Sequence, residues 1–133
     1  MTFLDTNVIV RYLTTDDPGK AARCERLFNH MARGQATLTT HVLVVAEVIW
    51  VLAGTYRLAK ERVVDVLVRL LSLDGLRLDD KEGVLSALEV FRTKPIDFID
   101  AYNAVWMRAR GLEQIYSYDT DFDLIPGIRR LEP

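Results

Sequence analysis

The first nine residues constrain the fold most strongly, because they place a short apolar strand directly before a carboxylate and a helix start. Residues 2–5 have the pattern of a strand that stops at Asp5, and Thr6-Asn7 behind it can begin a helix. In a chain that alternates strands with helices, functional sites are built at the carboxyl ends of parallel strands. Asp5 is therefore either a helix-capping acid or a site residue, and this stretch alone leaves both open.

The rest of the chain continues this alternation. Short apolar or β-branched runs predict strands at about residues 2–5, 36–39, 76–78, 115–118 and 128–131. Longer runs, most with a helical period, predict helices at about residues 6–14, 16–33, 41–54, 59–74, 80–94 and 97–110. This order predicts an α/β fold with a parallel sheet and helices on both of its faces.

Composition narrows the class of protein. The chain has 133 residues, half of them hydrophobic and 27% charged, which predicts one compact domain with a well-buried core. Its net charge of −2 differs from that of a broadly basic nucleic-acid-coating protein, although a nucleic-acid substrate remains compatible with it. A single cysteine excludes an intrachain disulfide, and no secretory signal or membrane span is evident, so we expect a cytoplasmic protein.

Glu47 lies in the apolar helix predicted at residues 41–54, which has Gly54 at its end. A carboxylate in such surroundings is costly unless charge or hydrogen bonds compensate for its desolvation. The alternative is that Glu47 occupies a thin exposed stripe on an otherwise buried helix. The apolar run leaves little room for such a stripe, which favours a role in a site.

Asp97 and Asp100 lie three residues apart at the start of one helix and therefore share a face. Acids in a first turn are common because they complement the helix dipole, so one of the two is expected to be the cap. Asp97, close behind Pro95, fits the cap, whereas Asp100, with Asn103 one turn further on, is better placed to face a site.

Asp119 follows the strand at 115–118 directly, as Asp5 follows the first strand. Asp121 and Asp123 come next, and the stretch has either the composition of an acidic turn or that of a ligand-binding loop. It lacks the glycine and the distant glutamate of an EF-hand. Asp119 is nearest the strand end and is the predicted site residue, with Asp121 as a candidate accessory ligand.

Four acids from four separate elements, Asp5, Glu47, Asp100 and Asp119, would repel one another if they met without cations. Carboxylate oxygens select hard ions, so Mg²⁺ or Mn²⁺ is expected and zinc is not. Two such ions, roughly 3.5–4 Å apart, can activate a water and stabilise the leaving oxygen in phosphodiester cleavage. The chain has no glycine-rich phosphate loop, nucleophile elbow or dinucleotide fingerprint that would indicate another chemistry.

The ordered set of motifs resembles the PIN domain family, and specifically the VapC-type toxins of bacterial and archaeal toxin–antitoxin pairs. The matching residues are Leu4-Asp5-Thr6-Asn7-Val8, Glu47 in its apolar helix, Asp97-Phe98-Ile99-Asp100-Ala101 and Ser117-Tyr118-Asp119-Thr120-Asp121-Phe122. They span the chain nearly end to end. The resemblance implies a three-layer α/β/α sandwich with a short, mostly parallel central sheet of four to five strands, formed by residues 1–133 as a single domain.

The resemblance also implies a metal-dependent endoribonuclease that hydrolyses RNA phosphodiester bonds through a metal-activated water. It assigns metal binding and catalysis to Asp5, Glu47, Asp100 and Asp119, with Asp121 as a further ligand and Mg²⁺ or Mn²⁺ as the cofactor. The residues expected to orient these acids or to contact the substrate are Thr6, Asn7, Arg11, Lys94, Asn103 and Ser117. The implied partners are a structured RNA such as transfer RNA, a second copy of the chain, and a VapB-type antitoxin that reaches into the acidic site, often with an arginine.

Two other functions compete with this one. A catalytically inactive PIN fold could serve as an interaction module, although the presence of all four acids argues against it. A magnesium-binding phosphoacceptor signalling domain would need paired acids at the first strand and a lysine near the last. Here the first strand offers only Asp5, and no lysine follows Lys94.

Overall fold

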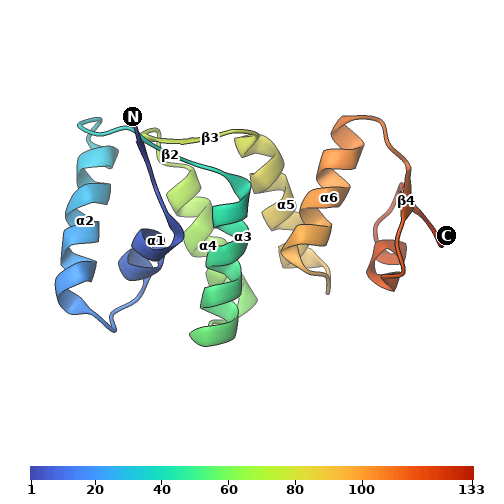
Figure 1. Cartoon of the computed structure of the whole chain (residues 1–133), viewed down its shortest axis with the longest axis horizontal. Coiled ribbons are helices and arrows are strands. Elements are labelled where there is room, and N and C mark those ends of the chain that lie inside the picture. The colour runs from blue at the N-terminus through green and yellow to red at the C-terminus, as the bar shows by residue number, and fades with distance from the viewer. The chain divides into compact units, whose positions relative to one another are not determined.

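The computed structural model describes residues 1–133, which form two compact units, Met1–Lys81 and Glu82–Pro133 (Figure 1). The strands are β1 (Thr2–Phe3), β2 (Leu38–Thr40), β3 (Leu76–Leu78), β4 (Gln114–Tyr116) and β5 (Arg129–Leu131). The α-helices are α1 (Thr6–Leu13), α2 (Pro18–Ala32), α3 (Val42–Trp50), α4 (Lys60–Leu71), α5 (Lys81–Thr93) and α6 (Phe98–Ala109). The predicted alternation of strands and helices, and with it the α/β fold class, is confirmed.

All five strands pair in parallel, as predicted, but they form two sheets. The first unit holds β1, β2 and β3 in that order, and the second unit holds β4 beside β5. The expectation was one sheet of four to five strands. Each strand is only two or three residues long, so each ladder contains few hydrogen bonds and ends where a turn or helix begins.

The three-stranded sheet buries one set of alternating side chains. Leu38 and Thr40 of β2 are buried, and so are Leu76 and Leu78 of β3, whereas Arg77 between them is exposed. The Thr40 hydroxyl donates a buried hydrogen bond of 3.0 Å to the carbonyl oxygen of Leu4. This bond fixes the chain next to β1 immediately before Asp5, so the position of Asp5 is set by the sheet and not by a long loop.

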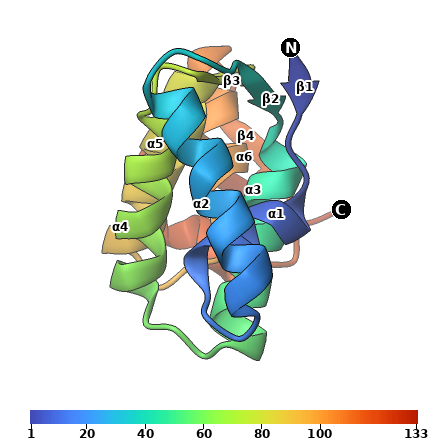
Figure 2. The same cartoon turned by 90° about the vertical axis from the view of Figure 1, so that its left-hand side faces the viewer.

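Helices α1 and α2 pack against each other in the first unit, and Figure 2 shows them side by side. The rings of Tyr12 and Phe28 lie 4.3 Å apart between centroids, which joins the two helices. Asp17 caps α2 by accepting a hydrogen bond of 3.0 Å from the backbone N–H of Lys20, and Pro18 occupies the first helical position. The helix ends at Ala32, and Gly34 follows two residues later with a φ of +71° that a glycine adopts without strain. The predicted helix start and stop are both confirmed.

The apolar segment 41–54 differs from its prediction in two respects. It is α3 followed by a π-helical turn, Val51–Thr55, and is not one continuous α-helix. It also carries an exposed stripe at helical spacing: Leu43 is 71% exposed, Glu47 is exposed, and Trp50 is 78% exposed. The expectation that the apolar run leaves little room for an exposed stripe was wrong, because two large apolar residues share that stripe with the glutamate.

The second unit packs α5 and α6 through aromatic side chains and joins β4 to β5. Phe91 and Phe98 meet edge to face, with centroids 6.3 Å apart and an interplanar angle of 87°. Helix α6 ends before Gly111, whose φ is +68°, as the sequence predicted. A short 3₁₀ helix, Thr120–Leu124, follows β4 and was not predicted, because its acidic composition resembles a turn. No helix in either unit combines the length and the apolar character that crossing a membrane requires.

Candidate metal centre

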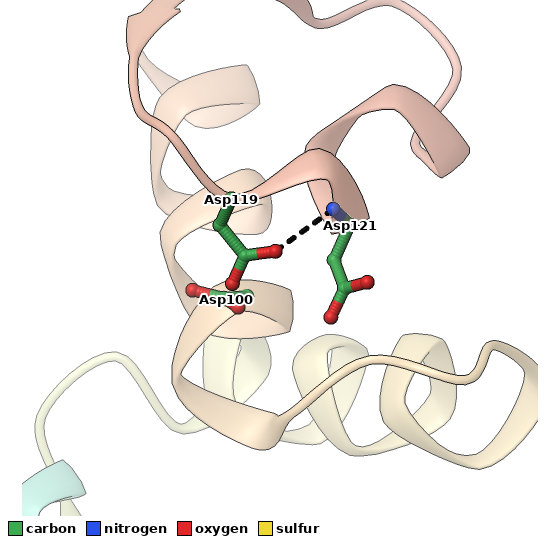
Figure 3. Close-up of side chains that lie close together, drawn as sticks. All are labelled: Asp100, Asp119 and Asp121. Atoms are coloured by element: carbon green, nitrogen blue, oxygen red, sulfur yellow. Dashed lines mark hydrogen bonds between the residues drawn. The ribbon is translucent and has the colours of Figure 1, made fainter.

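Three carboxylates meet in the second unit (Figure 3). One oxygen from each of Asp100, Asp119 and Asp121 lies within 4.8 Å of the others. Asp100 projects from the first turn of α6, Asp119 follows β4, and Asp121 belongs to the 3₁₀ helix. The predicted pair of Asp100 and Asp119 is therefore brought together, and Asp121, the proposed accessory ligand, joins them.

The backbone around β4 holds Asp119 in place. Its carboxylate Oδ1 accepts a hydrogen bond of 2.9 Å from the N–H of Asp121, so one oxygen caps the 3₁₀ helix. Its own N–H donates to Oγ of Ser117 at 3.0 Å, and the Ser117 N–H donates to the Leu131 carbonyl of β5 at 3.0 Å. Ser117 is thus a support for Asp119, and Figure 3 shows the second Asp119 oxygen directed toward Asp100.

Burial and the negative charge of the cluster raise the pKa of Asp100. Its pKa is raised from 3.8 to about 6, first by burial and next by the negative charge of Asp97. The charge of Asp119, a hydrogen bond with the Asp119 carboxylate and the charge of Asp121 raise it further. The ion pairs of Arg92 with Glu89 and of Arg130 with Asp123 and Glu132 do not include the three acids. Repulsion among the carboxylates therefore contributes to the raised pKa of Asp100.

The donor set fits a hard divalent cation. All three groups are carboxylates, and no cysteine or histidine belongs to the cluster. Oxygen-only sites suit Mg²⁺ and Mn²⁺ and do not suit zinc, which prefers nitrogen and sulfur. A cation would also remove the repulsion that raises the pKa of Asp100.

The other two predicted acids lie in the first unit. Asp5 is exposed at the N-cap position of α1, and its side chain makes no capping hydrogen bond. Its carboxylate therefore stays available to a ligand, which weakens the alternative that Asp5 only caps the helix. Glu47 is exposed on α3, a helix that packs against α1. The participation of these two acids in the metal site remains a prediction.

The predicted supporting residues have different surroundings. In the first unit Thr6 is buried and Asn7 is exposed, while Arg11 forms an ion pair of 3.0 Å with Asp16. In the second unit Asn103 is exposed on α6, one turn after Asp100, and Lys94 is half-buried just beyond α5.

Asp97 has a role that the sequence argument missed. It occupies the N-cap position of α6, as predicted, but its side chain makes no capping hydrogen bond. Its charge is the largest electrostatic influence on the pKa of Asp100. The signal was present in the three-residue spacing, which places both carboxylates on one face of α6.

A cluster of carboxylates on a parallel α/β fold defines a class of metal-binding domains, and comparison with known proteins gives the family. The model of the PIN domain family matches residues 2–128, so the chain belongs to the PIN domain family. A curated relative is the VapC ribonuclease of Aquifex aeolicus, which is 20% identical over 133 residues, covering 100% of this chain and 97% of that protein. The resemblance found in the motifs is confirmed.

Among solved structures, the chain aligns with that of VapC20 from Mycobacterium tuberculosis, described as a sarcin-ricin loop cleaving toxin. The sequence identity is 20%, the TM-score is 0.43, and the alignment covers 100% of both chains.

Proposed function

We propose that this protein is a divalent-metal-dependent endoribonuclease and the toxin of a type II toxin–antitoxin pair. The observation that carries the proposal is the meeting of the Asp100, Asp119 and Asp121 carboxylates within 4.8 Å of one another. Membership of the PIN domain family and the similarity to a VapC ribonuclease support it. The proposed setting is the cytoplasm.

In this proposal Asp100, Asp119 and Asp121 hold Mg²⁺ or Mn²⁺, and Asp5 and Glu47 are the further carboxylates that we propose for metal binding and catalysis. A bound divalent ion supplies Lewis acidity toward the scissile phosphate and lowers the pKa of a water molecule, the nucleophile of phosphodiester hydrolysis. The chain's own contribution is to fix the ligands. Ser117 and the backbone of the 3₁₀ helix hold Asp119, so one of its oxygens is already oriented before a ligand arrives.

The remaining predicted residues act around this centre. Thr6 and Asn7 follow Asp5 at the start of α1 and orient it, and Asn103 lies one turn from Asp100 on α6. Arg11 and Lys94 are the proposed contacts to substrate phosphates. The proposed partners are RNA, with transfer RNA as the first candidate, a second copy of the chain, and a cognate VapB-type antitoxin.

Cleavage of a labelled total transfer RNA pool tests the function directly. Purified protein is incubated with the pool in Mg²⁺, in Mn²⁺ and in EDTA, in parallel with the Asp119→Asn variant. We expect cutting that requires metal and falls by at least about 100-fold in the variant, because a metal ligand is lost. The matched control is Asp123→Asn, which changes an exposed acid of the same 3₁₀ helix that pairs with Arg130 and lies outside the cluster.

Two results would contradict the proposal. Cutting that persists in EDTA would show that the reaction does not require a metal. Cutting that is equal in wild type and Asp119→Asn would show that the activity comes from a contaminant or from other residues. If the transfer RNA pool is not cut, the same assay with ribosomal RNA and with messenger RNA decides whether the protein is a ribonuclease of narrow specificity. Intact RNA in all three pools, with metal present, would favour the interaction module.

A further inference from the structure

A cationic groove lies between α1 and α2 in the first unit. It has a volume of about 450 Å³. Its lining consists of Asn7, Val8, Arg11, Lys20, Arg23 and Cys24. Three of these residues are cations and none is an acid, although the chain as a whole has a net charge of −2. The groove therefore concentrates positive charge on a protein that is otherwise slightly acidic.

The cations of the groove are available to an anionic ligand. Arg23 forms no ion pair, and Lys20 lies 3.8 Å from Asp17 in a pair whose side chains are 55% and 37% exposed. Exposed pairs of this kind contribute little and exchange readily for a better partner. Arg11 is different, because its Nη1 contacts Asp16 at 3.0 Å, and Asp16 also accepts hydrogen bonds from Thr14 and Tyr56. That network fixes the Arg11 side chain at the groove and leaves its other N–H groups free.

The groove begins close to Asp5, a proposed catalytic acid of the same unit. Asn7 lines the groove and lies two residues after Asp5, in the first turn of α1. A ligand lying along α1 and α2 would therefore pass next to the first proposed catalytic acid. Arginine guanidinium groups bind phosphate oxygens in pairs, and two of the three cations are arginines.

We propose that this groove binds the sugar-phosphate backbone of the RNA substrate, with Arg11, Lys20 and Arg23 contacting phosphates. The assignment rests on the proposed ribonuclease function and adds a binding surface to it. RNA is favoured over an acidic peptide because the groove begins beside the residue proposed for phosphodiester chemistry. Val8 and Cys24 supply an apolar surface between the cations, against which a ribose or base can lie.

The single cysteine of the chain makes the test site-specific. Cys24 lines the groove, is partly exposed and forms no disulfide. Its rate of alkylation by iodoacetamide is measured in EDTA, which prevents metal-dependent cleavage, with a fluorescein-labelled 20-nucleotide single-stranded RNA as the probe. RNA in the groove should slow the alkylation at least about threefold at concentrations that saturate binding, since Cys24 becomes covered.

Variants connect this protection to the cations. Arg23→Glu should remove the protection, weaken RNA binding and reduce the slope of log K against log salt by about 0.7 per lost phosphate contact. Arg62→Glu is the matched control, because Arg62 is an exposed arginine on α4 in the same unit and lies outside the groove. It should leave both the protection of Cys24 and the salt dependence unchanged.

The outcomes separate this inference from the proposed function. If RNA does not slow the alkylation of Cys24 in a protein that still cuts RNA with metal, the groove is not the RNA-binding surface, and the proposed nuclease function is unaffected. Poly-glutamate that protects Cys24 better than RNA does would overturn it in favour of an acidic peptide. RNA that neither binds nor is cut would overturn the function and the groove together, whereas protection that Arg23→Glu abolishes and Arg62→Glu preserves would support the groove.

Discussion

Replacing Asp100 by asparagine should stabilise the metal-free protein while removing a metal ligand. The pKa of Asp100 in the folded protein is raised to about 6 from its ordinary value of 3.8, first by burial and next by the charges of Asp97 and Asp119. A raised pKa means that the folded state binds the proton more tightly than the unfolded state does. Below pH 3.8 Asp100 is protonated in both the folded and the unfolded state, and it does not lower the free energy of unfolding. Between pH 3.8 and 6 the free energy of unfolding falls as pH rises, and above pH 6 the full destabilisation by the ionised Asp100 remains.

The size of the effect follows from the shift. A difference of about 2 pH units corresponds to about 3 kcal/mol at 1.36 kcal/mol per unit. Asp100 is only partly buried, so water screens much of the repulsion, and we expect about 1 kcal/mol. Asparagine keeps the shape of the side chain without the charge. The free energy of unfolding of Asp100→Asn in EDTA should therefore exceed that of wild type by about 1 kcal/mol at pH 7.5, or about 4 °C in Tm.

Urea unfolding followed by circular dichroism at pH 7.5 and pH 4 measures the difference. The advantage of Asp100→Asn should be present at pH 7.5 and nearly absent at pH 4, and Mg²⁺ should stabilise wild type more than the variant. Asp74→Asn provides the control, because Asp74 is an exposed acid in the turn after α4 in the other unit, and it should shift neither value. An equal gain at both pH values, or no gain at pH 7.5, would refute the electrostatic argument.

Two further predictions concern the metal and the packing. The affinity for Mn²⁺ is measured by electron paramagnetic resonance of the free ion. It should fall by about tenfold per pH unit below pH 6, because the ion must displace the proton that Asp100 then holds. An affinity that does not change between pH 7 and pH 5 would exclude Asp100 as a ligand. Gly75→Ala should lower the free energy of unfolding in urea by about 1–3 kcal/mol. The reason is that a Cβ at Gly75 would lie 2.8 Å from the Met31 carbonyl oxygen and 3.0 Å from that of Ala36. A variant as stable as the wild type would contradict this and would show that the backbone next to β3 can shift to accept the Cβ.

The sequence predicted the fold where local patterns decide it. Helix positions followed from apolar periodicity and from Pro18, Gly34 and Gly111, and the observed ends lie within a few residues of the predicted ones. It failed where three-dimensional packing decides. The exposed stripe on α3 could not be predicted, because Leu43 and Trp50 have the composition of core residues but lie on the outer side of the helix. The π-helical turn was not predicted either, and Tyr56, which follows it, donates a hydrogen bond of 2.6 Å to Asp16, a residue far away in the sequence.

In the candidate metal centre, too, the local part could be predicted from the sequence and the part that depends on tertiary packing could not. Asp119 and Asp121 belong to one short segment, and their relation is local, since one carboxylate oxygen of Asp119 caps the backbone N–H of Asp121. Asp100 reaches them only because α6 and the segment after β4 pack together. Its position at the start of a predicted helix did not show how far it lies from Asp119 and Asp121. Its raised pKa is the physical sign of that contact, because burial and neighbouring charges act on it together. A fold that needed these acids only as helix caps would gain nothing by gathering three carboxylates within 4.8 Å of one another, which is why we propose a bound cation as the reason for their meeting.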